Sequence, residues 1–348
     1  MFTTIHDVAR IAGVGVGTVS RVINNSPGVR PSTREKVLSV IAELHYKPDP
    51  IARSMISKRT GAIGVIVPFF TRPFITEMLK GVESTLAHLE KELVIYNVEN
   101  DSQRDRYFTE LPMRRKVDGL LVISLPVADA VSSSFKDAGL QVVLVDAYSP
   151  YLTSVVVDNI QGAYEAVKYL LSLGHRRIGF INGIIEGNFK FNQANDRLIG
   201  FHRALGEAGL PFSPELVQTS AWDRDGGKAA AMQLLTLKKR PSAIFAASDM
   251  QAIGVIEAAR MLHIDIPGEL SVIGYDGIEI SELLELTTMH QPTLQMGELG
   301  IARLIEQIEH PDQAPELIRF NATLIERRTT SPYSADKGTD AFDAIEAL

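Results

Sequence analysis

The 348-residue sequence contains no cysteine, which excludes disulfide bonds, thiolate metal sites and cysteine nucleophiles. No uninterrupted apolar run approaches the roughly 18 residues of a membrane-spanning helix, and the first residues lack the apolar stretch of a signal peptide. We therefore expect a cytoplasmic protein with no membrane partner. With 45% hydrophobic and 22% charged residues, the chain has the composition of a globular protein and the length for two or three domains.

Motifs of common enzyme classes are also missing. The chain has no GxSxG nucleophile elbow, no GxxxxGK[ST] phosphate loop, no HExxH zinc motif and no GxGxxG after a strand. The GVGVG run at 13–17 has the wrong spacing for a dinucleotide loop and lies between helical segments. We expect no catalytic residues, no cofactor and no metal site, and we interpret the protein as a non-enzyme.

Residues 4–24, TIHDVARIAGVGVGTVSRVIN, have the pattern of a helix-turn-helix. Apolar residues recur at helical spacing up to Ala12, Gly13 stands where a helix needs a left-handed stop, and the spacing resumes at Val19. On the second helix Val16, Gly17 and Arg21 are predicted to face away from Val19, free to enter a DNA major groove. We expect Val16 to contact a thymine methyl group and Arg21 to read a guanine.

A third helix follows and completes a small helical head. Residues 32–35, STRE, predict a capping box with Ser32 as N-cap and Glu35 at the third helical position. The helix is expected to stop before Pro48. Taken by pattern alone, a small helical bundle without any DNA role stays an alternative.

The distribution of charge favours DNA binding by the head. The chain carries a net charge of −7, but residues 1–59 carry +5 and the rest carries −12. A basic head attracts phosphates, whereas an acidic body discourages non-specific coating of DNA. A chance imbalance is the simpler alternative.

These motifs resemble the lactose/galactose repressor family of bacterial transcription regulators. The resemblance rests on IHDVARIAG, GTVSRVIN, PSTREKV, YKPDPIARSM and, near residue 330, ERRTT, in the family's order and spacing. It implies a hinge segment at 49–59 that pairs with its dimer mate on DNA, with Met55 wedged into the minor groove and Ala52 beside it. The residues that we expect to contact DNA are Thr4, Ile5, Val16, Gly17, Thr18, Ser20, Arg21, Asn24, Ala52 and Met55.

From residue 60 the pattern changes to short apolar runs that alternate with helical stretches, beginning with GAIGVIVPFF at 61–70. Such runs predict buried parallel strands, and the alternation restarts after VVVDN at 155–159. The body is therefore predicted to consist of two doubly wound α/β lobes, whose strand ends meet at a ligand-binding rim.

The resemblance adds that the body is similar to a periplasmic sugar-binding protein, with the chain crossing between the lobes three times. It implies a head at 1–48, a hinge at 49–59, a body at 60–331 and a tail at 332–348. The first lobe is expected at 60–157 and 290–320, and the second at 158–289 and 321–331. The tail is too short for the heptad helix of tetrameric relatives, so we expect a homodimer.

Residues at the predicted strand ends are candidates for a ligand site. Carboxylates accept hydrogen bonds from vicinal hydroxyl groups, an arginine donates to the same ligand, and the only tryptophan offers a ring face. The effector-binding residues that we expect are Phe74, which matches a cleft position of the family, and Ser124, Asp146, Arg197, Trp222, Asp249 and Asp276. In each case a structural role stays open: an N-cap for Asp249 or Asp276, an interlobe ion pair for Arg197, and a core or rim position for Trp222.

We interpret the chain as a DNA-binding transcriptional regulator, more specifically a repressor, whose affinity for a palindromic operator is controlled by a small ligand. A sugar is the favoured effector, and the resemblance implies pentoses, hexoses, phosphosugars or purines as the ligands that relatives bind in variations of the same cleft. The alternatives are a periplasmic-type sugar-binding protein without a DNA role and, third, an α/β sugar enzyme.

Overall fold

The structure is a computed structural model that describes residues 3–23, 26–46, 60–89, 91–114, 116–184 and 191–334. The chain folds into two compact units, residues 1–61 and residues 62–348. The expected hinge residues Ala52 and Met55, the expected DNA contact Asn24 and nearly all of the expected tail lie outside the described residues.

The described residues of the first unit form three helices, α1 (Ile5–Ala12), α2 (Val16–Ile23) and α3 (Pro31–Glu43). Their apolar faces meet in one small core that includes Val8, Ala12, Val19 and Val37. Gly13 has a φ of 64° and ends α1, a left-handed conformation that glycine adopts without the steric cost of a side chain. The predicted helix-turn-helix geometry follows from this turn.

The predicted capping box of the third helix is wrong. Helix α3 begins at Pro31, two residues earlier than expected, with Arg30 as N-cap and no side-chain cap. Proline suits the first helical position because its fixed φ is helical and its missing N–H would have no partner there. A capping box does exist in the head, but on α1, where Thr4 and Asp7 cap each other's backbone N–H groups.

In the second unit the described strands form two six-stranded sheets. The first has the order β11-β5-β4-β3-β1-β2, and all its pairings are parallel. The second has the order β12-β10-β9-β8-β6-β7 and is parallel except for the β10–β12 pair. The strands are β1 (Ala62–Pro68), β2 (Glu92–Val98), β3 (Gly119–Ile123), β4 (Gln141–Val145), β5 (Thr153–Val157), β6 (Ile178–Gly183), β7 (Val217–Ser220), β8 (Ala243–Ala246), β9 (Ser271–Asp276), β10 (Thr287–His290), β11 (Leu317–Phe320) and β12 (Thr323–Ile325).

Helices cover both faces of each sheet, so each lobe has an apolar core on either side of its strands. In the first lobe the helices are α5 (Pro73–Leu86), α6 (Asp101–Arg114), α7 (Asp129–Asp137) and α13 (Thr293–Glu309). In the second they are α8 (Asn159–Ser172), α9 (Asn192–Glu207), α10 (Arg224–Leu235), α11 (Asp249–Met261) and α12 (Glu279–Leu283), with a short 3-10 turn at Pro214–Leu216. The predicted fold class, a helical head followed by a two-lobed doubly wound body, is confirmed.

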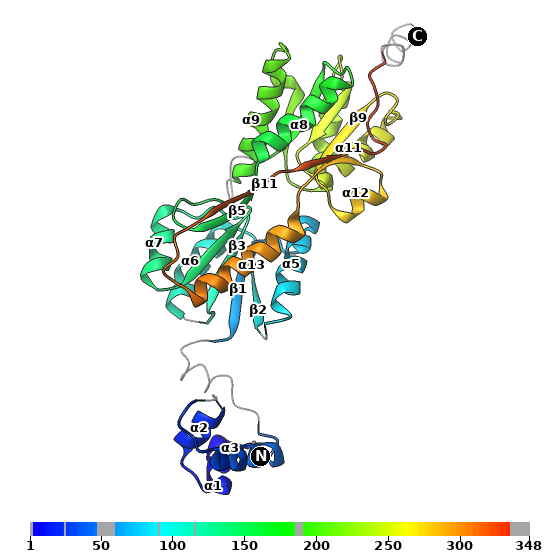
Figure 1. The fold of residues 1–348 in the computed structure, drawn as a ribbon. Helices are drawn as coiled ribbons and strands as arrows, with labels where there is room; N and C mark the ends of the chain where they lie inside the picture. The colour runs from blue at the N-terminus through cyan, green and yellow to red at the C-terminus, as the bar shows by residue number, and fades with distance from the viewer. Residues whose placement is uncertain are drawn as a thin grey trace. The chain divides into compact units, whose positions relative to one another are not determined.

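The chain passes between the two lobes after β5, after β10 and after β11. In Figure 1, α13 lies beside α5 on the first sheet although some 200 residues separate them, and β11 runs along β5. The passages contact one another and the lobes: the Asp158 amide donates to the carbonyl oxygen of Phe320 at 2.9 Å, and that of Gln291 donates to the carbonyl oxygen of Asp276 at 2.9 Å. The carboxyl ends of the central strands face the space between the lobes.

Candidate functional site

Four residues at strand ends have a left-handed backbone. Phe69 follows β1, Ser124 follows β3, Asp146 follows β4 and Asp276 ends β9, with φ values of 48°, 55°, 56° and 124°. A residue other than glycine in such a conformation costs on the order of 1–3 kcal/mol, and such residues gather at binding sites. All four border the same space between the lobes.

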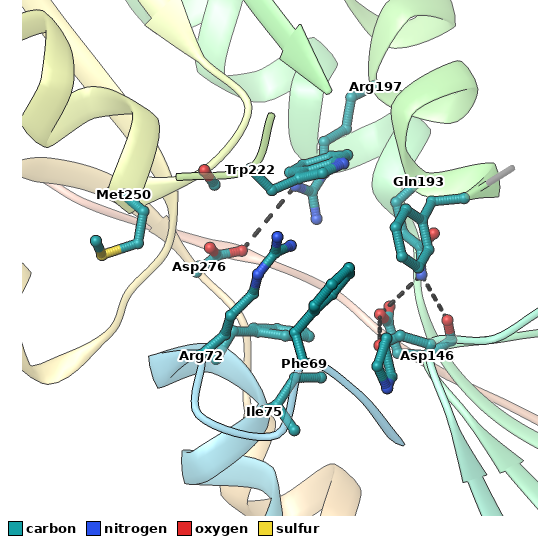
Figure 2. A pocket seen from close by; sticks show the side chains of 14 residues that line it. Phe69, Arg72, Ile75, Asp146, Gln193, Arg197, Trp222, Met250 and Asp276 are labelled. Atoms are coloured by element: carbon teal, nitrogen blue, oxygen red, sulfur yellow. Dashed lines mark hydrogen bonds and ion pairs between the residues drawn. The ribbon is translucent and has the colours of Figure 1, made fainter. Parts of the chain in front are cut away.

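A cavity lies between the lobes and is lined by both, and its space, including the part open to solvent, is about 610 Å³. Figure 2 shows its side chains converging from the first-lobe strands and α5 on one side and from the second-lobe loops and α9 on the other. The first lobe contributes Pro68, Phe69, Arg72, Phe74, Ile75, Ser124 and Asp146, and the second contributes Phe191, Gln193, Arg197, Trp222, Ser248, Met250 and Asp276.

A direct hydrogen bond joins the lobes inside this cavity. The Gln193 side-chain amide, from the first turn of α9, donates to the carbonyl oxygen of Asp146 at 2.6 Å and to its Oδ2 at 2.7 Å. Ser124 Oγ donates to the same Oδ2 at 2.6 Å. Burial raises the pKa of Asp146 to about 6, although the hydrogen bond from Ser124 and the charge of Arg197 act in the opposite direction.

Arg197 is held in the second lobe by several contacts. Its Nε donates to Asn159 Oδ1 at 2.9 Å, its Nη1 donates to the carbonyl oxygen of Ala247, and its guanidinium lies 3.8 Å from the ring centroid of Tyr275. An ion pair of 4.0 Å links Nη1 to Asp276 Oδ1. This arginine is therefore positioned before any ligand binds, which lowers the ordering cost of binding.

Asp276 lies between Arg197 and the second passage of the chain between the lobes. The Gln291 side-chain amide donates to Asp276 Oδ1 at 2.9 Å. Burial raises the pKa of Asp276 well above its ordinary value, and the charge of Arg197 opposes this shift. A hydroxyl group of a ligand would supply a further hydrogen bond to this carboxyl group.

Aromatic rings form the walls between these polar groups. Trp222 packs flat against Gly183, where a Cβ atom would come within 1.9 Å of the ring, so only glycine leaves room for the indole. The ring of Phe191 meets Trp222 edge to face at a centroid distance of 6.4 Å. Carboxylate, amide and guanidinium groups among aromatic faces suit a compact ring molecule that carries hydroxyl groups.

Comparisons with known proteins identify the family. Residues 4–49 match the bacterial regulatory proteins of the lacI family, and residues 167–330 match the periplasmic binding protein-like domain. The HTH-type transcriptional repressor PurR of Pectobacterium carotovorum subsp. carotovorum (strain PC1) is 34% identical, over 95% of this chain and 98% of its own length. The chain belongs to the lacI family.

Solved structures of this family share the whole architecture. A transcriptional regulator CelR–cellobiose complex is 30% identical with a TM-score of 0.70 and covers 94% of this chain and 99% of its own. The lac repressor dimer bound to operator and the anti-inducer ONPF is 26% identical with a TM-score of 0.83. The match covers 95% of this chain and 100% of the lac repressor chain. This lacI-family protein is accordingly a DNA-binding transcriptional regulator with a small-molecule effector.

The structure brings six of the seven residues expected in the effector site to the cavity of this lacI-family regulator. They are Phe74, Ser124, Asp146, Arg197, Trp222 and Asp276. The parallel sheets explain this convergence, because the carboxyl ends of neighbouring strands meet at one edge. The expected ion pair of Arg197 exists, but its partner Asp276 belongs to the same lobe.

Asp249 is the exception, and its expected place in the ligand site is wrong. Its side chain is fully buried and accepts hydrogen bonds from the backbone N–H groups of Gly277 and Ile278 at 2.7 and 3.0 Å and from the hydroxyl groups of Ser281 and Thr288 at 2.5 and 2.6 Å. Four donors occupy its carboxylate, so it clamps the loop after β9. It is not the N-cap of α11 either, because Ser248 has that role.

Several lining residues were not predicted from the sequence. Gln193 stands four residues before Arg197, and this spacing places both on one face of α9, a signal that could have found it. Phe69 and Arg72 follow β1 just as Ser124 follows β3, but a loop pattern does not reveal where their side chains point. The others are Pro68, Ile75, Phe191, Ser248 and Met250.

In the head, Gly17 and Arg21 of α2 are exposed, as expected for a DNA-reading surface. Val16 is half-buried and packs against the head core, so less of it can reach a base than expected. Ile5 likewise packs partly on the core, and the exposed Thr4 caps α1. Thr18 and Ser20 are half-buried on α2.

Within the described ranges, no helix has both the length and the apolar character needed to cross a membrane. In the same part of the chain, no group of three or more His, Asp or Glu side chains is placed to hold a metal ion.

Proposed function

We propose that this protein is a repressor that binds a palindromic operator as a homodimer and whose operator affinity depends on a sugar bound between the lobes. The observation that carries the proposal is the cavity itself, in which carboxyl, guanidinium and amide groups alternate with aromatic rings. Asp146 and Asp276 would accept hydrogen bonds from sugar hydroxyl groups, Arg197 and Gln193 would donate to sugar oxygens, and Trp222 would cover an apolar ring face. No turnover of the sugar is part of the proposal.

The contacts of two cavity residues with the interlobe passages support a coupling between ligand and lobe position. Arg197 is hydrogen-bonded to Asn159, the first residue of α8 after the passage from β5, and Asp276 is hydrogen-bonded to Gln291, directly after β10. A ligand that moves either side chain therefore acts on the segments about which the lobes rotate. Coupling to DNA then requires that the ligand bind the DNA-competent and DNA-incompetent lobe arrangements unequally.

The DNA-binding part of the proposal assigns residues 1–48 to the head, 49–59 to the hinge and 60–331 to the body. Two heads would occupy successive major grooves of an operator of roughly 14 to 20 base pairs, with paired hinge segments in the central minor groove. The lac repressor dimer bound to operator, which shares this chain's architecture, supports this arrangement.

Titration calorimetry of the full-length protein against sugars, sugar derivatives, nucleosides and free bases tests the proposed effector class. We expect a sugar to bind, and we expect Asp276→Asn to weaken binding at least about tenfold, since a hydrogen bond to a charged group contributes roughly 1.5–3 kcal/mol. Asp137→Asn, an exposed residue at the end of α7, is the control and should leave binding unchanged. Binding of a free base with no binding of any sugar would reject the proposed class.

A further inference from the structure

Arg72 places a positive charge in the cavity that the sequence did not predict. It lies in the loop between β1 and α5, directly before Pro73, the first residue of that helix. Its half-buried side chain lines the cavity, with the guanidinium carbon 4.1 Å from the ring centroid of Phe69. Figure 2 shows the guanidinium extending from this loop into the space among Trp222, Asp276 and Phe69.

The Arg72 guanidinium has no hydrogen-bond or ion-pair partner among the described residues. Its five N–H donors thus contrast with those of Arg197, which meet Asn159, Ala247 and Asp276. The negative charge of Asp223 attracts the guanidinium without a hydrogen bond to it. The Asp223 carboxylate is already the N-cap of α10, where it accepts a hydrogen bond from the Gly226 backbone N–H at 2.8 Å. Burial lowers the pKa of Arg72, so holding this charge in the cavity costs free energy when no anion is present.

The other three charged groups that line the cavity each have hydrogen-bond or ion-pair partners. Asp276 is matched by Arg197 and Gln291, and Asp146 by Ser124 and Gln193. Burial raises the pKa of both carboxyl groups, to about 6 for Asp146. Arg72, beside the Phe69 ring, is therefore the charged group of the cavity that has no hydrogen-bond or ion-pair partner among the described residues.

We propose that the effector is an anionic sugar, whose carboxylate or phosphate group binds Arg72 while its hydroxyl groups bind Asp146 and Asp276. This inference rests on the proposed function and deepens it by naming the ligand class. The planar fork of a guanidinium pairs with a carboxylate or a phosphate through two parallel hydrogen bonds, which a neutral sugar cannot offer. Arg72 is thus the specificity-determining residue, and the aromatic and carboxyl groups provide the general sugar site.

Calorimetry with matched ligand series tests this assignment on the full-length protein. Each series contains a neutral aldose, its uronic and aldonic acids and its phosphate, for example glucose, glucuronate, gluconate and glucose 6-phosphate, with the galactose equivalents. We expect the acids or the phosphate of one series to bind at least about ten times more tightly than the neutral parent. The comparison within that series distinguishes a carboxylate ligand from a phosphate ligand.

Variants of Arg72 provide the second arm. Arg72→Ala should weaken binding of the anionic ligand by about 10- to 100-fold, which is the effect of losing a charged hydrogen-bonded pair. Its affinity for the neutral parent sugar should stay within about threefold of that of the wild type. Arg72→Lys, which keeps the charge but not the fork, should recover part of the affinity. Thermal melting of each variant shows whether the fold is intact.

The outcomes separate the two proposals. Equal binding of neutral and anionic sugars, or anionic binding that Arg72→Ala does not change, overturns the role of Arg72 and leaves the sugar proposal standing. If Arg72→Ala lowers the affinity for neutral and anionic sugars equally, the assignment is also overturned. Arg72 would then act by attracting Asp223 of the other lobe and not by binding the anionic group of the ligand. Absence of binding by every sugar rejects the proposed function itself.

Discussion

At the scale of single residues, Asp146 combines three properties that together tie its charge to the contact between the lobes. It has a left-handed backbone, it is almost fully buried, and it accepts the hydrogen bonds of Gln193 that join the lobes. A carboxyl group in this place makes lobe closure depend on its charge. The two residues that hold it, Ser124 and Gln193, come from different lobes, so a ligand that displaces Gln193 replaces an interlobe contact with its own.

We predict that Asp146 lowers stability as the pH rises. The ordinary aspartate pKa is 3.8, and that of Asp146 in the folded protein is about 6. Between these values the folded state keeps a proton that the unfolded state has lost, so the free energy of unfolding falls from about pH 4 to about pH 6. The full penalty, present above that range, is roughly 3 kcal/mol, since one pKa unit corresponds to about 1.4 kcal/mol.

Urea unfolding of the wild type and Asp146→Asn at about pH 4.5 and about pH 7 measures this contribution. The variant, which cannot ionise and tolerates a left-handed backbone, should lose less stability than the wild type on going to the higher pH. Asp137→Asn, which changes an exposed carboxyl group, should behave as the wild type does. Parallel pH profiles for the wild type and Asp146→Asn would contradict the assigned shift.

A second residue-scale prediction concerns Arg21, which is exposed on α2. Arg21→Ala should reduce the ratio of specific to non-specific DNA affinity by about 1–3 kcal/mol, because a bidentate contact to guanine discriminates among bases. Arg10→Ala on α1 removes another exposed positive charge of the head and should weaken both kinds of binding alike. Fluorescence anisotropy on an operator selected from random sequence, against a scrambled duplex, gives both affinities. An unchanged ratio of specific to non-specific affinity for Arg21→Ala would mean that another residue makes the base contact.

At the scale of elements, the sequence predicts what periodicity and chain order determine. Buried apolar runs predicted the strands, and the parallel order placed Ser124, Asp146 and Asp276 at one edge. Side-chain direction is decided by tertiary contacts instead, which is why Asp249, at an equivalent strand end, was wrongly assigned to the site. Pro31 shows the same limit, since its preference for the first helical position overrode the capping pattern at Ser32.

Helices α5 and α13 come from distant parts of the chain and cross at glycines. A Cβ atom at Gly297 would stand 2.1 Å from the carbonyl oxygen of Met78. We predict that Gly297→Ala destabilises the body by about 1–3 kcal/mol, because the helices must move apart. Gly206→Ala on α9, where a Cβ atom meets nothing within 4 Å, should stabilise by up to about 1 kcal/mol. Urea unfolding compares the two, and equal effects would contradict the close crossing.

The loop that carries Asp276 depends on Asp249. We predict that Asp249→Ala destabilises the protein by roughly 3 kcal/mol or more, since it leaves two backbone N–H groups and two hydroxyl groups buried without their acceptor. Asp225→Ala, in the first turn of α10 and 78% exposed, is the matched control and should change stability by less than about 0.5 kcal/mol. Denaturant titration measures the free energy of unfolding of both variants. If Asp249→Ala lowers it no more than the control does, Asp249 does not hold the loop after β9 in place.

At the scale of the whole molecule, three parts of the chain are connected: the cavity, the interlobe passages and the DNA-binding head. Ligand contacts are made in the cavity, Asn159 and Gln291 connect the cavity to the interlobe passages, and the first lobe follows the DNA-binding head in the chain. The sign of the effect depends on which lobe arrangement the ligand prefers, a difference of contact free energies that no sequence pattern encodes.

Operator affinity of the full-length protein with and without its saturating sugar tests this account most directly. We predict that the two dissociation constants differ at least tenfold, a coupling of about 1.4 kcal/mol, and that Asp276→Asn brings them together at the same ligand concentration. Equal operator affinities at proven saturation of the cavity would contradict the account, because a ligand bound there would then have no influence on DNA.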